Sequence, residues 1–316
     1  MPVSRQTGQV KIALIVNPVA SSVNKRSRIV IQKALSADHE LTVTETARKG
    51  QATRLAYQAA KSGTELILAL GGDGTINEVV NGILDQDCIV APIPGGSTNV
   101  FARSIGYPNE AVEATGSILE AITANSIKKA SVGLANGRAF LFHVGAGFDA
   151  AVVQKVEEKG PLKKYIGHPL FIASTLATWI KGVDRKNPWF SVETSDGQRI
   201  SAAQLAVALN CNPYTYLGNR PLDLAPEATL DSPLSIIVLT KLSVSKLLPS
   251  VIQAIRSSTG IQDSAATRHL SEIETASLTG YRPFPYQLDG EFLDPVEKLE
   301  LESKADAINL LVPTGT

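Results

Sequence analysis

The glycine-rich segment around Asp73 holds side chains whose types and spacing suit chemistry on an anion. An apolar run at 66–70 ends in Gly71-Gly72-Asp73-Gly74, and apolar residues then recur at helical spacing. Glycines let backbone N–H groups approach phosphate oxygens, and a helix that begins beside them adds its N-terminal dipole. A carboxylate is expected there when a divalent cation lies between it and the phosphates. The segment therefore predicts a site for a Mg2+-nucleotide, although Gly-Gly-Asp-Gly by itself is more often a tight turn.

Two further segments repeat this construction, in which a strand ends in a polar loop. One apolar run leads into Pro94 and the loop 95–99, and the run 11–16 leads into Asn17 and Pro18. Ligands of open α/β sheets bind beyond the carboxyl ends of the strands, so the three loops are expected to lie together around one nucleotide. The glycine segment at Asp73 has neither the fingerprint Gly-x-Gly-x-x-Gly nor the P-loop ending Gly-Lys-Ser/Thr, so neither a Rossmann cofactor site nor a P-loop is predicted.

Four motifs follow one another over nearly the whole chain: Asn17-Pro18, the block 71–82, the block 94–103 and Asp289-Gly290-Glu291. In this order they resemble the diacylglycerol kinase catalytic-domain family, which includes bacterial soluble lipid kinases, sphingosine kinases and ceramide kinases. The block 71–82 matches the family pattern in full and the block 94–103 matches it with one departure. A weaker match is Thr46, four residues before Gly50, which resembles an additional nucleotide contact of the family.

The resemblance implies ATP-dependent phosphoryl transfer to a hydroxyl of a diacylglycerol-like or sphingoid lipid. In-line transfer needs positioned phosphates, a charge-neutralising metal and a base on the acceptor hydroxyl. The family pattern implies Asp289 as the first candidate for the base and Glu291 as the second, with Asp73 as the Mg2+ ligand. An Asp-Gly pair alone would indicate a hairpin turn. The implied nucleotide-binding residues are Asn17, Pro18, Thr46, Gly71, Gly72, Asp73, Gly74, Thr75, Asn77, Gly96, Ser97 and Asn99.

Two departures from the family pattern concern acidic residues. Val100 stands where the family has Asp, and Ser232-Pro233 stands where it has Asp-Gly. Bacterial members of the family use that second Asp for a structural metal. Asp231 and backbone carbonyls would make a poor site for a hard cation, so we expect the accessory Mg2+ network to be absent and a substrate-borne Mg2+ at Asp73 to remain. The acid-free Gly-Ser-x-Asn loop resembles that of sphingosine kinases.

The composition excludes several classes of partner. The chain has 316 residues with 30 Lys plus Arg and 30 Asp plus Glu, so no basic field attracts nucleic acid. The two cysteines, Cys88 and Cys211, lack metal-ligand spacing and are expected to be reduced core residues. His143 and His168 are isolated, and we expect packing or surface roles for them. The polar N-terminus and the lack of a run of about 18 apolar residues predict a cytoplasmic protein without a transmembrane segment.

The organisation of the chain changes near residue 128. Strands and helices alternate over residues 1–127, which predicts an α/β nucleotide-binding domain of three layers, of the NAD kinase/diacylglycerol kinase-like type that the resemblance implies. Short alternating runs over residues 128–316 predict an all-β, antiparallel β-sandwich with helical inserts at about 148–182 and 243–256. The last predicted strand, 307–312, either stays in the second domain or returns to the first.

The predicted elements of the first domain are strands at 11–16, 41–46, 66–70 and 88–93 and helices at 24–37, 51–62, 75–84, 97–104 and 109–124. Those of the second domain are strands at 129–134, 138–145, 189–194, 198–210, 235–240 and 272–279.

A mostly apolar helix is predicted at 165–180 and is flanked by Lys163, Lys164 and Lys181. It would suit contact with a membrane surface and an acyl chain, and ordinary core packing explains it equally well. The expected partner is therefore a lipid substrate, met by a protein that is cytoplasmic or peripheral at the membrane. The sequence leaves open whether the protein forms a homodimer.

Two other functions compete with a lipid kinase. An NAD kinase shares Gly-Gly-Asp-Gly and the two-domain plan, but the Asn-Glu motif that it would need after a later strand is not found. A catalytically silent nucleotide-binding regulator is suggested by Val100 and Ser232. The presence of Asp73, Asp289 and Glu291 argues against such a regulator.

Overall fold

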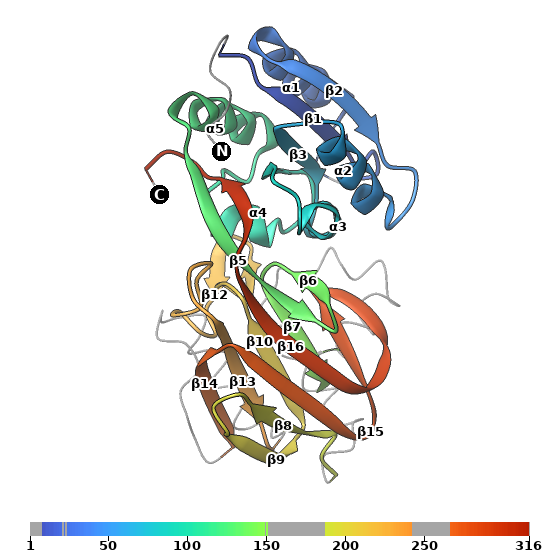
Figure 1. Ribbon diagram of the computed structural model, residues 1–316, viewed down its shortest axis with the longest axis vertical. Coiled ribbons are helices and arrows are strands. Elements are labelled where there is room, and N and C mark those ends of the chain that lie inside the picture. The colour runs from blue at the N-terminus through green and yellow to red at the C-terminus, as the bar shows by residue number, and fades with distance from the viewer. Residues whose placement is uncertain are drawn as a thin grey trace. The chain divides into compact units, whose positions relative to one another are not determined.

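The computed structural model describes residues 8–20, 22, 24–148, 150, 187–241 and 266–315. The chain forms two compact units, one of Met1–Ala130 with Asp306–Thr316 and one of Ser131–Ala305 (Figure 1). The helix predicted at 165–180 with its flanking lysines, His168, and nearly all of the two predicted helical inserts lie outside the described residues.

A parallel sheet forms the centre of the first unit, in the order β2-β1-β3-β4. The end of one more strand runs parallel to β4 and pairs with it through Asn309 and Leu310, so the last predicted strand lies in this unit. The strands are β1 (Lys11–Val16), β2 (Glu40–Glu45), β3 (Leu66–Gly71), β4 (Ile89–Pro94) and β16 (Glu291–Leu311).

Helices cover both faces of this sheet. The helices are α1 (Lys25–Asp38), α2 (Gln51–Lys61), α3 (Asp73–Ile83), α4 (Val100–Ser104) and α5 (Ala111–Ala124). The chain leaves β1 toward β2 on one side and returns to β3 on the other, and right-handed crossovers then place α1 and α2 on opposite faces. In agreement, α1 packs against α5 and α2 packs against α3. The predicted three-layer α/β architecture is confirmed.

The second unit consists mainly of antiparallel strands in the order β14-β13-β10-β7-β15-β16, as predicted for an all-β region. Its other strands are β5 (Ile127–Ala135) and β6 (Arg138–Phe140), which pair with each other, β8 (Phe190–Thr194) and β9 (Arg199–Ala203), and the small pair β11 (Thr215–Leu217) and β12 (Arg220–Leu222). The strands of the main order are β7 (His143–Gly147), β10 (Leu205–Leu209), β13 (Leu234–Leu239), β14 (Thr267–Ile273) and β15 (Thr275–Leu288).

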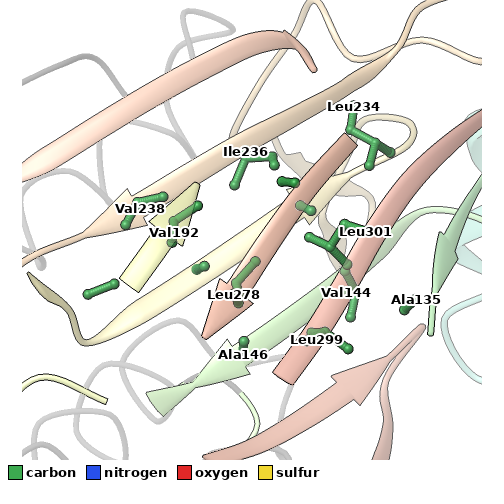
Figure 2. Close-up of a cluster of buried hydrophobic side chains, with 14 of the residues drawn as sticks. Ala135, Val144, Ala146, Val192, Leu234, Ile236, Val238, Leu278, Leu299 and Leu301 are labelled. Carbon is green, nitrogen blue, oxygen red and sulfur yellow. The ribbon is translucent and has the colours of Figure 1, made fainter. Parts of the chain in front are cut away.

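The long strand β15 belongs to two layers because it bends. It pairs with β8 through residues 276–280 and with β7 through residues 286–288, and its register with β16 shifts on both sides of Phe284. Pro283 and Pro285 lie in this bend, where a missing N–H is tolerated. Side chains of both layers meet in the core shown in Figure 2, among them Val144, Ala146, Val192, Leu234, Ile236, Val238, Leu278, Leu299 and Leu301.

The predicted bounds of the elements within residues 1–127 agree with the structure to within one or two residues, except at one helix start. The helix predicted at 97–104 begins only at Val100, because Asn99 has a left-handed φ of 50° and ends a loop. The last strand, predicted at 307–312, is the end of the much longer β16 (Glu291–Leu311).

In the second unit, the runs 138–145, 198–210 and 272–279 were wrongly predicted as one strand each, and each contains residues of two strands. The chain changes its pairing partner at these breaks without a glycine or proline to mark the change.

Gly82 allows α3 to pack closely on α2. A Cβ atom at Gly82 would lie 2.2 Å from the backbone oxygen of Thr53 and 3.0 Å from the Cβ of Ala56. We expect Gly82→Ala to lower the free energy of unfolding by about 1–3 kcal/mol, measured by urea denaturation. The matched control is Gly116→Ala in α5, where the added Cβ meets no atom within 4 Å and should stabilise the helix by about 0.5–1 kcal/mol. Equal effects at the two positions would contradict the packing explanation.

Candidate active site

Loops at the carboxyl ends of neighbouring strands are hydrogen-bonded to one another. The backbone N–H of Asn17, after β1, donates to the oxygen of Leu70 at 2.9 Å, and the Asn17 side chain donates to the hydroxyl of Thr75 at 3.2 Å. Ser22, in the same loop, donates from its N–H to Gly95 (3.1 Å) and from its hydroxyl to Gly96 (3.0 Å), both after β4. The three loops predicted to lie together therefore do so, on both sides of the point where the strand order reverses.

The two glycine loops touch through their backbones. A Cβ on Gly96 would lie 2.8 Å from the Cα of Gly72, and a Cβ on Gly71 would lie 2.4 Å from the hydroxyl oxygen of Thr75. These glycines are therefore required by packing within the protein. Gly74 differs from them, because it is exposed, has no left-handed φ, and would place a Cβ in open space. Nothing in the fold of the described residues requires a glycine at position 74.

Asp73 joins the first glycine loop to the second. Its carboxylate accepts the N–H of Val100 at 3.0 Å and the N–H of Phe101 at 2.9 Å, and so it caps the N-terminus of α4. Burial raises the pKa of this carboxyl above its ordinary value, against the opposing effects of the two N–H groups and of the Arg103 charge. Sequence reasoning gave Asp73 the roles of a metal ligand and a nucleotide-binding residue and missed this cap.

Glu78 has a similar role that sequence reasoning also missed. Its two carboxylate oxygens accept the N–H of Gly50 at 2.7 Å and the N–H of Ala52 at 3.0 Å, at the start of α2. One signal was present in the sequence, since the residue before this helix is a glycine that offers no capping side chain. Thr46, the residue after β2, is bound to the end of β1, with its N–H 2.8 Å and its hydroxyl 3.4 Å from the oxygen of Val16.

Two of the side-chain amides predicted to contact the nucleotide are buried and form hydrogen bonds within the protein. Asn99 is buried, and its side chain bonds both the N–H and the oxygen of Gly96 and the side chain of Asn109. Asn77 is buried and accepts from the side chain of Asn81. Ser97 and Pro18 are exposed at the loops.

Asp289 occupies the turn between β15 and β16 with φ of 48°, followed by Gly290 at 81°, so the predicted hairpin turn is present. Its carboxylate accepts three backbone N–H groups, from Leu141 at 2.7 Å, Phe142 at 3.0 Å and His143 at 3.1 Å. Its own N–H donates to the oxygen of His143 at 2.9 Å. The carboxylate therefore holds the segment between β6 and β7 in place.

Glu291 forms an ion pair with Arg138, whose Nη2 lies 2.6 Å from its carboxylate. Both side chains are partly buried, and Arg138 was not singled out from the sequence. The predicted site residues thus fall in two groups, since Asp289 and Glu291 belong to the second unit and the nucleotide loops to the first.

The positions that depart from the family pattern have protein partners of their own. Val100 is buried at the start of α4. The hydroxyl of Ser232 contacts the N–H and the hydroxyl of Thr229 at 3.1 and 3.3 Å and lies 3.4 Å from the oxygen of Glu227, which closes this loop. Within the ranges that the structure describes, no cluster of three or more His, Cys, Asp or Glu side chains is placed to hold a metal ion. Cys88 and Cys211 are buried and form no disulfide, as expected.

Comparison with known proteins gives the same picture. Residues 11–135 match the sequence profile of the diacylglycerol kinase catalytic domain. The chain is 34% identical to the diacylglycerol kinase of Bacillus subtilis (strain 168) over 176 residues, 54% of each chain, and 27% identical to that of Staphylococcus carnosus (strain TM300) over 291 residues, 89% of this chain and 90% of the other. The crystal structure of a diacylglycerol kinase from Bacillus anthracis str. Sterne has the same fold, with a TM-score of 0.71, 24% identity, and coverage of 96% and 97%.

The fold and these matches define the chain as a kinase. Its residues 11–135 match the diacylglycerol kinase catalytic domain, and nearly its whole length is similar to a diacylglycerol kinase. No helix of the described ranges is both long and apolar enough to pass through a membrane.

Proposed function

We propose that this protein is an ATP-dependent lipid kinase that transfers the γ-phosphate of Mg2+-ATP to a hydroxyl of a diacylglycerol-like or sphingoid lipid. The names of the relatives support the lipid as acceptor. The observation that supports nucleotide binding is the free space at Gly74, which lies at the start of α3 and beside the two glycine loops that contact each other. We place the enzyme in the cytoplasm, where it meets its substrate at a membrane surface.

In this proposal, phosphate oxygens bind at the N-terminus of α3, where N–H groups and the helix dipole favour an anion. Gly74 lets the phosphates come close to the backbone. Thr75 lies beside it in α3, and Asn17 and Ser97 lie in the adjoining loops. Each Asp73 oxygen accepts one N–H and keeps one lone pair, so Asp73 would hold a Mg2+ that arrives with the nucleotide. The ion would neutralise negative charge on the phosphoryl group during its transfer.

Asp289 is the proposed base for the acceptor hydroxyl. The hydroxyl oxygen forms a bond to the γ-phosphorus while the bond from that phosphorus to the bridging oxygen of ADP breaks, and the hydroxyl proton passes to the Asp289 carboxylate. A loose transition state needs the proton removed only late, so a fixed orientation matters more than a high basicity. The three N–H groups that Asp289 accepts provide that fixed orientation.

The test of nucleotide binding is Gly74→Val. Because the new side chain points into space that the fold leaves open, we expect an unchanged melting temperature and a loss of about 10²-fold in kcat/KM for ATP. Gly116→Val, at an equally open position of α5, is the matched control and should keep full activity. If Gly74→Val turned over ATP like the wild type, the nucleotide would have to bind elsewhere.

The acceptor is identified by incubating the protein with labelled ATP, Mg2+ and diacylglycerol, a sphingoid base, ceramide or NAD, with Gly74→Val as the inactive comparison. Label in a lipid with the wild type only is the expected result. Label in NAD would favour the NAD kinase-like alternative, and no transfer to any acceptor would favour a silent regulator.

A further inference from the structure

A ring of hydrogen bonds joins the ends of β1 and β2 to helix α3. The N–H and the hydroxyl of Thr46, after β2, lie 2.8 and 3.4 Å from the oxygen of Val16, the last residue of β1. The next residue, Asn17, donates from its side chain to the hydroxyl of Thr75 in α3 at 3.2 Å. Glu78 of α3 closes the ring, because its carboxylate accepts N–H groups from the segment that follows Thr46. The three segments therefore hold one another in place.

Glu78 supplies the acceptors for the start of α2. Its two carboxylate oxygens accept the N–H of Gly50 at 2.7 Å and the N–H of Ala52 at 3.0 Å. Gly50 is the N-cap of α2 and offers no side chain, and the first turn of α2 holds no acidic residue. A carboxylate from α3 therefore accepts the first N–H groups and also complements the helix dipole. Residues 47–50 are all exposed, so hydrogen bonds rather than packing must order them.

Glu78 lies one helical turn after the proposed phosphate site. Four residues separate it from Gly74, about 6 Å along the helix axis. It also lies three residues after Thr75, on the same side of α3. The segment 46–50 follows the carboxyl end of β2, and ligands of α/β sheets bind beyond such strand ends. Glu78 thus ties this segment to the helix at which the phosphates are proposed to bind.

We propose that Glu78 is a positioning residue for ATP, which holds segment 46–50 beside the phosphate site as part of the nucleotide-binding surface. This inference rests on the proposed ATP-dependent kinase function and adds a residue to its nucleotide site. Glu78 itself touches neither ATP nor the lipid. Without its carboxylate the segment is ordered in only a fraction of the molecules, and the affinity for ATP falls by that fraction. The rate of transfer in the complex changes little, because bound ATP orders the segment.

The test compares Glu78→Ala with Glu110→Ala. Glu110 is the matched control, since its carboxylate accepts the N–H groups of Val112 and Glu113, both at 2.9 Å, and caps α5. Both variants lose a helix cap, so both melting temperatures should fall by a similar amount, roughly 2–4 °C. Only Glu78→Ala should raise KM for ATP, by about tenfold, with kcat and KM for the lipid changed less than about twofold.

Trypsin gives a second measurement that needs no kinase activity, because Arg48 and Lys49 place two cleavage sites in the exposed segment. We expect cleavage there to be about tenfold faster in Glu78→Ala than in the wild type or in Glu110→Ala. A non-hydrolysable ATP analogue with Mg2+ should slow it in the wild type. Glu78→Gln covers the case in which Glu78→Ala is poorly folded. Its amide oxygen still accepts one N–H, so the same changes should appear at about threefold.

Unchanged KM for ATP in Glu78→Ala would overturn the inference, even with faster cleavage, since the segment would then be held by Glu78 without contacting the nucleotide. An equal rise of KM in Glu110→Ala would also overturn it, because a general loss of stability would then be the cause. If Gly74→Val abolishes binding of the ATP analogue and Glu78→Ala leaves it unchanged, Glu78 has no positioning role while the proposed function stands. A wild type that binds no nucleotide refutes the proposed function and this role together.

Discussion

Replacing Asp289 by asparagine is expected to reduce kcat by about 10² to 10⁴-fold, the usual contribution of a general base. The substitution should also lower the free energy of unfolding by about 1–3 kcal/mol, because an amide NH2 would face an N–H donor of Leu141 or of Phe142 and His143. Both effects arise from the same carboxylate, which holds the segment between β6 and β7 and is the proposed proton acceptor.

The two effects of Asp289→Asn are separated by measuring kcat with saturating substrates well below the melting temperature of the variant. Glu291→Gln is the matched control in the same hairpin, since the amide can still accept from Arg138 and only the charge of the pair is lost. We expect Glu291→Gln to lower kcat far less than Asp289→Asn does. A folded Asp289→Asn protein with wild-type kcat would exclude the base role and leave Asp289 a structural residue.

The second large effect concerns acid stability and the buried ring of His143. Burial lowers the pKa of His143 to about 3 in the folded protein, whereas a histidine of an unfolded chain titrates near 6.5. Between these two pH values the unfolded chain binds the proton and the folded protein does not, so folding loses stability as the pH falls below about 6.5. Above that pH both states are neutral and the group has no effect.

His143→Phe should therefore become more stable relative to the wild type as the solution is acidified. We expect the difference in the free energy of unfolding to grow by about 2–3 kcal/mol between pH 7 and pH 4.5, the linkage value for a group that stays neutral only when folded. Urea denaturation of the two proteins across this range measures it. Ser277→Ala, which removes a buried group that does not titrate, should differ from the wild type by the same amount at every pH. A constant difference for His143→Phe would show that its ring is not a neutral buried group.

The acidic residues of the first glycine motif act over distances that local sequence does not reveal. Asp73 caps a helix whose N–H groups come 27 and 28 residues later, and Glu78 accepts N–H groups from residues 28 and 26 positions earlier. Each carboxylate fixes a neighbouring loop by accepting hydrogen bonds from backbone N–H groups. Because nearly every residue type has a backbone N–H, the sequence does not show which residues the carboxylate binds. Loss of activity in an Asp73 variant would thus report loop order as well as any loss of Mg2+ binding.

The elements of the first unit and the place of its glycine loops were determined by the sequence alone. Strands β1 to β4 are short apolar runs bounded by polar loops, and each helix shows its own periodicity, so local spacing was enough to predict them within one or two residues, apart from the start of α4. Glycines directly after buried strands also located the loops at one edge of the sheet, because parallel strands share the direction of their carboxyl ends.

Only the tertiary structure decided which groups these residues bind. The three N–H groups at Asp289 come from residues 146 to 148 positions earlier, and the end of β16 lies beside β4. The strand breaks near residues 141 and 204 likewise follow a change of pairing partner rather than a local signal. Backbone preferences act between near neighbours in sequence, whereas a hydrogen-bond partner is set by how distant segments pack.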